Sequence, residues 1–232
     1  MESRQHKRTF CEEISYNFYH LKLAMRQEPL RDMLLFFVLY GITRPSTVTF
    51  LYFFKQEVLG LSQAQVNFIN FIGLFPLLFV ASVYRFYMQG VDSKVIYRWL
   101  VLINMIASVG DLLFVLKVHR AIGISDMVAS YFTASALTPL IYLCFFVPGC
   151  VIIAKLIPTH VEASVYAIAV SIANTAFYLL SSWMCLFWNL FFGITSKDMS
   201  NLYKLCIVQV FLSACTIFYV RFVPDWSTVF KA

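Results

Sequence analysis

The sequence predicts an all-α, polytopic membrane protein with six transmembrane helices. Of its 232 residues, 60% are hydrophobic and only 13% are charged, whereas soluble domains contain about 25% charged residues. The mean hydropathy is +0.75. The apolar residues fall into six long segments, each with the roughly 20 residues that cross about 30 Å of hydrocarbon.

Residues 1–31 are polar and charged and precede the first apolar segment. Phe10, Ile14, Phe18 and Leu21 follow helical spacing within them, which favours an amphipathic helix on the membrane surface. A loose cytoplasmic tail is the alternative. The stretch is too charged to supply the apolar region of a cleavable signal peptide. We therefore assign it to the cytoplasm as a charged tail or an interfacial helix.

A transmembrane domain over residues 32–224 follows, and residues 225–232 form a cytoplasmic C-terminal tail. The predicted spans are residues 32–54, 64–88, 95–117, 127–154, 161–191 and 201–223. The fourth and fifth spans are the longer ones, which predicts that they tilt or extend beyond the bilayer. Four prolines fall inside spans, at Pro45, Pro76, Pro139 and Pro148. Neighbouring membrane helices can satisfy the backbone groups that such breaks release.

The distribution of Lys and Arg predicts the orientation. Six spans place both termini on one side, and with that side inside, twelve Lys and Arg are cytoplasmic and five are external, Lys55 among the latter. Basic residues accumulate on the cytoplasmic side of membrane proteins. The sequence therefore predicts that both termini are cytoplasmic.

Polar residues at membrane depth are functional candidates by default. Arg44 lies near the middle of the first span, and Asn104, Ser108 and Asp111 form one stripe of the third. We predict that Arg44 and Asp111 meet, directly or through water or solute, because each deep charge needs a partner. A structural ion pair and a role in solute or proton coupling both remain open for them.

The fifth span carries a further polar line. Ser171, Asn174 and Tyr178 share one face at 3.6 residues per turn. Together with Arg44 and the stripe of the third span, this line predicts a polar path for a planar solute on which a few aromatic side chains stack. Most of the aromatic residues are assigned to packing and lipid contact. In the second span Asn67 and Asn70 are expected to form helix–helix hydrogen bonds.

Glu162 begins the fifth span and has two interpretations. It stands three residues after Thr159, so it can complete a capping box and meet the positive end of its own helix. It also lies on the side predicted for Arg85 and Arg98, with which it would form a structural latch. The other interpretation is substrate or proton coupling. We favour the structural role.

One stretch carries a family resemblance. Its matching residues are Pro158, Glu162, Ala163, Tyr166, Ala167, Ser171, Ile172 and Asn174. They resemble the signature of the folate–biopterin transporter family, a branch of the major facilitator superfamily. The resemblance covers residues 31–224 and implies the C-terminal six-helix half of such a transporter. It departs from the family pattern at Ile157 and at His160 or Val161, where Cys-Pro and a Gly are more usual.

The resemblance implies secondary transport of pteridines such as folate or biopterin. Because these transporters have two six-helix halves with the site between them, it also implies a partner: a missing N-terminal half or a second copy in a homodimer. The alternative is a non-transporting, truncated half that assembles with or regulates full-length relatives. No nucleophile, acid–base cluster or metal-ligand spacing appears in the sequence. We therefore predict no enzyme activity, no cofactor, no metal site and no nucleic-acid partner.

Overall fold

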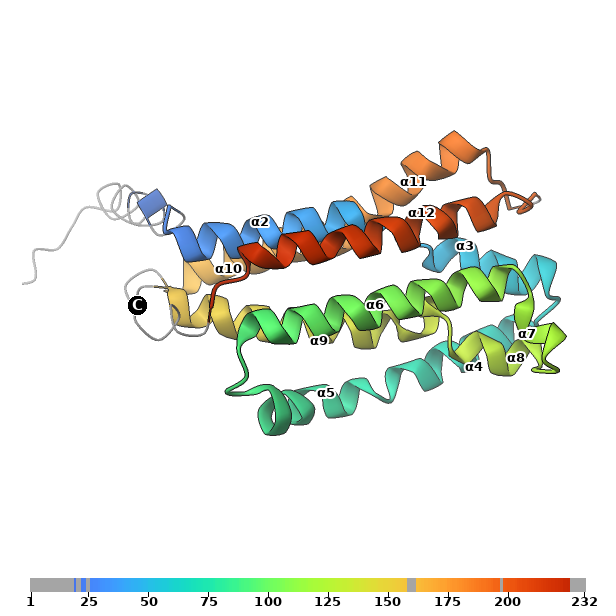
Figure 1. Cartoon of the computed structure of the whole chain (residues 1–232), viewed down its shortest axis with the longest axis horizontal. Helices are drawn as coiled ribbons and strands as arrows, with labels where there is room; N and C mark the ends of the chain where they lie inside the picture. Colours follow the sequence, from blue (N-terminus) through green and yellow to red (C-terminus); the bar gives the residue numbers. More distant parts are fainter. Residues whose placement is uncertain (1–18, 20–21, 24–25, 158–161, 197, 226–232) are drawn as a thin grey trace, which may run out of the picture.

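A computed structural model of the chain describes residues 19, 22–23, 26–157, 162–196 and 198–225. Within these residues the secondary structure is helical and contains no strand. Six helical stretches are long and apolar enough to cross a membrane. They run roughly along the longest axis of the molecule (Figure 1). The predicted all-α fold with six membrane spans is therefore confirmed.

The first two spans are built from several helical pieces, and the third is a single helix. The first span contains α2 (Glu28–Thr43), α3 (Val48–Phe53) and the π-helical turn η1 (Phe54–Val58). The second contains α4 (Gln63–Leu74), α5 (Leu77–Val83) and the π-helical turn η2 (Tyr84–Met88). The third is the uninterrupted helix α6 (Ser93–Val115). The first span starts earlier and ends later than predicted, and most of the predicted surface helix over residues 1–31 lies outside the described residues.

The last three spans follow two short helices, α7 (Val118–Ala121) and α8 (Asp126–Tyr131). The fourth span is α9 (Ala134–Leu156). The fifth contains α10 (Glu162–Asn174), the π-helical turn η3 (Thr175–Leu180) and α11 (Ser181–Phe192). The sixth contains α12 (Leu202–Cys215) and the 3₁₀ turn η4 (Thr216–Phe222).

The predicted fourth span, 127–154, is wrong at its beginning. The helix stops after Tyr131, where the Thr133 hydroxyl donates to the Ser130 carbonyl oxygen at 2.8 Å. Such a local bond competes with continued helix. The preceding helix α8 packs instead against α4. The fourth span is therefore shorter than the sequence pattern predicts.

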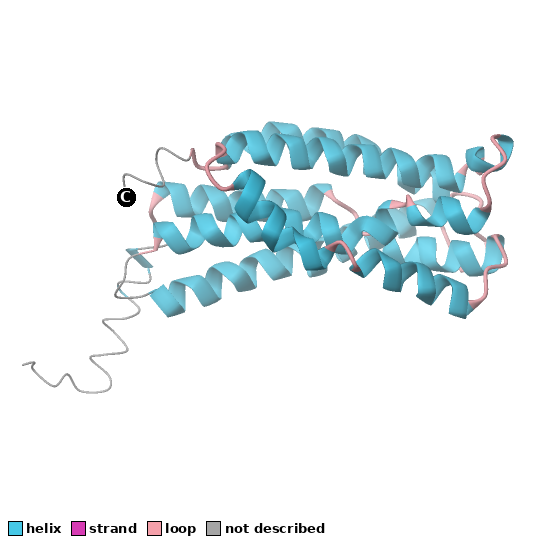
Figure 2. Ribbon diagram, turned by 90° about the horizontal axis from the view of Figure 1, so that it is seen from below, coloured by secondary structure: helices cyan, strands magenta, loops and turns pink. Residues whose placement is uncertain are grey.

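Several spans are interrupted near their middle. The first breaks between Thr43 and Val48, around Pro45, which has no N–H to donate to a helix. The break is tied to the fifth span because the Ser46 N–H donates to the Ser181 carbonyl oxygen at 3.0 Å. Figure 2 shows loops at the two ends of the bundle and further loops that interrupt helices within it. The interruptions of the first and fifth spans therefore lie together.

Two apolar clusters hold the bundle together. The first joins α2, α6, α9, α10 and η3. In it the Tyr40 ring packs at a tilt against Phe145 and Phe177, at ring distances of 4.4 and 5.1 Å. The second joins η1, the end of α6, α11 and α12. The bundle also buries polar side chains that belong to neither cluster, among them Thr47, Asn104 and Asp111.

The described ends of the chain lie at the same end of the bundle (Figure 1), as an even number of crossings requires. At this end Lys94, in the first turn of α6, forms an ion pair with Asp225 at 2.8 Å. The pair ties the end of the sixth span to the beginning of the third.

Candidate functional site

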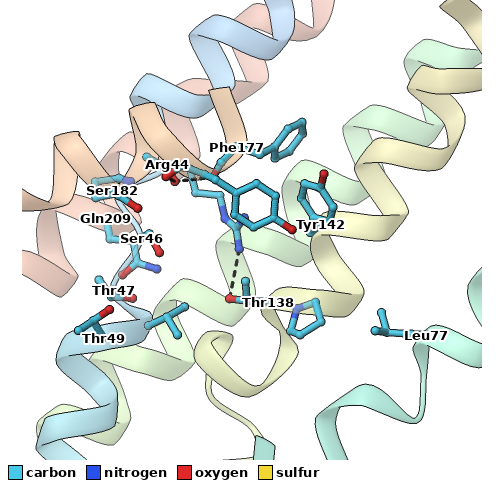
Figure 3. Close-up of a pocket in the computed structure, with 15 residues that line it drawn as sticks. Arg44, Ser46, Thr47, Thr49, Leu77, Thr138, Tyr142, Phe177, Ser182 and Gln209 are labelled. Carbon is cyan, nitrogen blue, oxygen red and sulfur yellow. Dashed lines mark hydrogen bonds between the residues drawn. The ribbon is translucent and has the colours of Figure 1, made fainter. Parts of the chain in front are cut away.

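A cavity of about 420 Å³ lies where the interrupted spans meet (Figure 3). Its wall comes from the break in the first span, the beginning of α9, the η3–α11 junction and Gln209 of α12. Most of these segments are near the middle of their spans. The cavity therefore lies deep in the bundle, at a size typical of small-molecule sites.

Arg44 contributes a positive charge to this wall. The chain leaves helical geometry at Arg44, so its side chain projects from the break. Its Nη2 atom donates to Thr138 Oγ1 at 3.5 Å, and its guanidinium carbon lies 5.9 Å from the centre of the Tyr40 ring. No carboxylate of the described residues lies within ion-pair distance of it. Because an uncompensated charge at this depth is costly, the cavity favours an anion beside Arg44.

Aromatic side chains line a further part of the wall. Tyr142, Phe177 and Tyr178 all border the cavity, and the Tyr142 ring lies 5.0 Å from each of the other two. The Tyr142 hydroxyl donates to Asn174 Oδ1 at 2.7 Å. Asn174 does not line the cavity itself, but its hydrogen bond orients Tyr142, which does. The arrangement offers flat π-faces to a ring-shaped solute.

The stripe of the third span is enclosed rather than exposed to this cavity. Asn104, Ser108 and Asp111 are buried between α6 and α12. Asn104 donates its side-chain amide to Ser213 Oγ at 3.4 Å, and the Ser108 and Ser213 hydroxyls are 3.2 Å apart. Asn104 and Ser108 therefore join α6 to α12, and these neighbours satisfy their polar groups.

Asp111 is fully buried but reaches the cavity through two neighbours. Its Oδ2 atom accepts from Thr47 Oγ1 at 3.4 Å and from Gln209 Nε2 at 3.3 Å. Thr47 and Gln209 are both wall residues. The Oε1 atom of Gln209 has no partner within the described part of the structure. Asp111 can thus interact with a solute in the cavity only through Thr47 or Gln209.

The sequence interpretation of Lys55 as an external loop residue is wrong. Lys55 lies in η1 with 1% of its surface exposed, and its Nζ donates to Thr133 Oγ1 at 3.4 Å. It interacts electrostatically with Asp111. The first span continues to Val58, so the lysine enters the bundle, where the buried carboxylate favours a cation.

The other predicted residues lie away from the cavity, except Tyr178. Ser171 is exposed and donates its hydroxyl to the Ala167 carbonyl oxygen of its own helix at 2.8 Å. Arg85 and Arg98 are exposed on η2 and α6. Glu162 is the first residue of α10, but its side chain and Thr159 lie outside the described residues. The latch and capping roles of Glu162 therefore stay predictions.

The sequence interpretation missed several wall residues, among them Thr138, Tyr142 and Gln209. Gln209 is a lone amide in an apolar span, and this isolated polar residue could have been recognised in the sequence as a site candidate. Thr138 and Tyr142 follow a segment whose helical break was not predicted, so their direction could not be inferred. Within the described residues, no three His, Cys, Asp or Glu side chains gather as a metal ion would require.

The fold and this cavity define a multi-pass helical membrane protein with a solute-sized site inside its bundle. The chain belongs to the BT1 family, whose model matches residues 3–231. The predicted resemblance to folate–biopterin transporters is thereby confirmed.

Curated relatives carry that name. The chain is 28% identical to probable folate-biopterin transporter 4 of Arabidopsis thaliana, over 86% of this chain and 40% of that protein. It is 25% identical to the folate-biopterin transporter of Synechocystis sp., over 80% of this chain and 37% of that protein. The chain thus spans less than half the length of these relatives. No solved structure matches it.

Proposed function

We propose that this chain is one six-helix half of a secondary transporter for pteridines of the folate or biopterin type. It would move its solute without chemical conversion. The observation that carries the proposal is the deep cavity in which Arg44, without a carboxylate partner among the described residues, faces an aromatic wall. Membership of the BT1 family and the names of the relatives support the choice of solute.

The chemistry of the cavity suits such a solute. A guanidinium binds a carboxylate through two parallel hydrogen bonds, and folates carry carboxylates. The faces of Tyr142 and Tyr178 can stack on a flat heterocycle. Ser46 and Thr49 add hydroxyl groups to the wall, and hydroxyls both donate and accept. The wall therefore offers charge, stacking and hydrogen bonds to one ligand.

The proposed transporter also requires a second six-helix half. Ser171, Asn174 and Tyr178 are exposed on the fifth span, and Tyr178 exposes 60% of its surface. Polar groups of a membrane span lie against protein or water rather than lipid. In two-half transporters the site lies between the halves. We propose that this face meets either an N-terminal half or a second copy of the chain.

The proposed orientation places both termini in the cytoplasm. The end of the bundle that carries Glu28 and Asp225 also carries Lys94, Arg85 and Arg98. An excess of Lys and Arg is typical of the cytoplasmic side. Burial of Lys55 removes one cation from the opposite side, which strengthens the asymmetry.

Uptake into proteoliposomes tests the function. The chain is reconstituted alone and together with the N-terminal six-helix half of a full-length relative, and uptake of radiolabelled folate and biopterin is measured. We expect saturable uptake only from the paired form or from a homodimer. Cysteines placed at Ser171 and Tyr178 should then cross-link across the junction, whereas one at Trp99, exposed on α6, should not.

Two outcomes would contradict the proposal. Saturable uptake by a chain shown to be monomeric in the liposome would remove the need for a second half. Assembly with full-length relatives that alters their uptake, without any uptake that depends on Arg44, would instead favour the non-transporting, regulatory half.

A further inference from the structure

A second cavity adjoins the one described above. It has a volume of about 430 Å³, and three of its wall residues, Val48, Thr138 and Pro139, also line the first cavity. The remainder of its wall comes from α4. Figure 3 shows Thr138 at the base of the first cavity, directly below Arg44. The two cavities therefore adjoin each other at this shared wall, and the pair is called the cleft.

We propose that this cleft is a two-part site for an elongated solute: a heterocycle held at Asn67 and Asn70, and an aromatic acid held at Arg44. The inference rests on the proposed function and adds which part of the solute each cavity takes. It also implies that a bare pterin uses one part, whereas a pterin joined to an aminobenzoyl-glutamate uses both.

The wall of the second cavity carries two amides on one face of α4. Asn67 and Asn70 are three residues apart, so they lie side by side on the helix, and both are exposed. The predicted helix–helix hydrogen bonds of these residues are not formed within the described part of the structure. Because an unpartnered amide on a membrane span is unfavourable, these groups suit a polar ligand in the cavity that they line.

The chemistry of this pair matches the edge of a pterin. Each amide offers two N–H donors and one carbonyl acceptor. The pyrimidine edge of a pterin presents an amino group, a ring N–H and a carbonyl oxygen side by side, which requires acceptors and donors close together. Phe71, one turn from Asn67, lines the same cavity and offers a ring face for stacking.

The first cavity suits the acidic end of the solute. Arg44 can bind a carboxylate, and Tyr142 and Phe177 can flank a benzoyl ring. The two kinds of chemistry are thus separated: charge occurs in the first cavity and uncharged amides in the second. A solute with a neutral heterocycle at one end and an acid at the other fits this polarity in one direction only.

Ligand binding tests the inference on the full chain, assembled in lipid nanodiscs with whichever second half supports uptake. The probes are folic acid, an unconjugated pterin and aminobenzoyl-glutamate. The variants are Arg44→Gln, Asn67→Leu and Asn70→Leu. The matched control is Gln63→Leu, which removes an exposed amide of α4 that lines neither cavity.

Each variant has its own expected signature. Arg44→Gln should weaken folic acid and aminobenzoyl-glutamate about tenfold or more and leave the pterin unchanged, because it removes a charge-assisted hydrogen bond. Asn67→Leu and Asn70→Leu should each weaken folic acid and the pterin about fivefold and spare aminobenzoyl-glutamate. Gln63→Leu should change none of the three.

The unmodified chain provides a test that needs no variant. If the cavities hold different parts of the solute, pterin and aminobenzoyl-glutamate bind together without competing. Competition between them, or unchanged pterin affinity in folded Asn67→Leu and Asn70→Leu, would overturn the two-part site while the proposed function stands. Absence of folic acid and pterin binding to the unmodified assembly would overturn both.

Discussion

Three charged side chains within the spans have different surroundings. Lys55 and Asp111 are both buried and interact electrostatically, whereas Arg44 is half-buried on the cavity wall. The predicted direct pairing of Arg44 with Asp111 is not among the described contacts, because Thr47, Gln209 and Lys55 surround the carboxylate. Bridging through water or solute stays a prediction. Lys55 and Asp111 therefore have a structural role, whereas the charge of Arg44 is available to a solute.

The buried pair predicts a non-additive stability effect. Lys55→Met or Asp111→Leu alone should lower the free energy of unfolding by about 3 kcal/mol, because each leaves one buried charge uncompensated. The double variant should recover most of this loss. Denaturant unfolding in detergent micelles measures all three, with Ile106→Ala, at an exposed position of the same helix, as a control. Additive losses would show that the two side chains do not act as a pair.

A second charged cluster lies outside the spans, between α7 and α8. Asp126 accepts from Arg120 Nε and Nη2 at 2.8 and 2.7 Å, and its Oδ1 lies 2.8 Å from His119 Nε2. His119 is stacked on Phe114 at a ring distance of 5.1 Å. Hydrogen bonds, first from Arg120 and then from His119, lower the pKa of Asp126 to about 2 although partial burial opposes the shift.

This pKa gives the cluster a defined pH dependence. The carboxyl pKa is lower in the folded chain than its ordinary value of about 3.9, so ionised Asp126 stabilises the fold above that pH. The contribution is lost as pH falls through about 2. Asp126→Asn should therefore lower the melting temperature at pH 7, and the difference from the unmodified chain should shrink between about pH 4 and pH 2. Asp32→Asn is the control, and a gap that widens on acidification would contradict the assignment.

At the scale of helices, the site depends on interruptions rather than on regular structure. The break at residues 44–47 and the turn η3 face each other, and the Ser46–Ser181 backbone bond joins them. Gly41 lets α2 approach the fifth span, because a Cβ atom there would collide with the carbonyl oxygen of Ala176. Close packing of two kinked helices thus brings Arg44 and Tyr178 to the same cavity.

Gly41→Ala tests this packing. The added methyl group meets backbone rather than a movable side chain, so we expect a loss of about 2 kcal/mol in unfolding free energy. Gly193→Ala is the comparison, since its site is spatially open and its φ of +64° strains an alanine by only about 1 kcal/mol. Detergent unfolding of both variants gives the ranking. A larger loss for Gly193→Ala would show that the α2–η3 contact is loose.

At the scale of the whole molecule, six crossings place the two described ends together (Figure 1). The charge asymmetry predicts that this side is cytoplasmic. This orientation can be measured directly. Single cysteines at Val91 and Asp198, which lie in connections at opposite ends of the bundle, should react with an impermeant reagent from opposite sides of the membrane. The parent chain, with its native cysteines, gives the background. Labelling of both positions from one side would refute the six-crossing topology.

The sequence by itself determined the class of the protein. Composition and the lengths of apolar segments are local properties, so they predicted six membrane helices. The resemblance to the family rested separately on the matching residues around Glu162 and Asn174. Arg44 and Tyr178 were also predicted as site residues, because a polar side chain in the middle of a span stands out against its neighbours. Both line the cavity.

Only the tertiary structure decided which polar faces meet which neighbours. Asn104 and Ser108 pack against α12, Lys55 turns inward, and Gln209 joins the cavity wall. Helical periodicity shows that residues share a face, but not what that face contacts. The answer depends on the kinks and rotations of all six helices packed together, since each break changes the direction of every side chain beyond it.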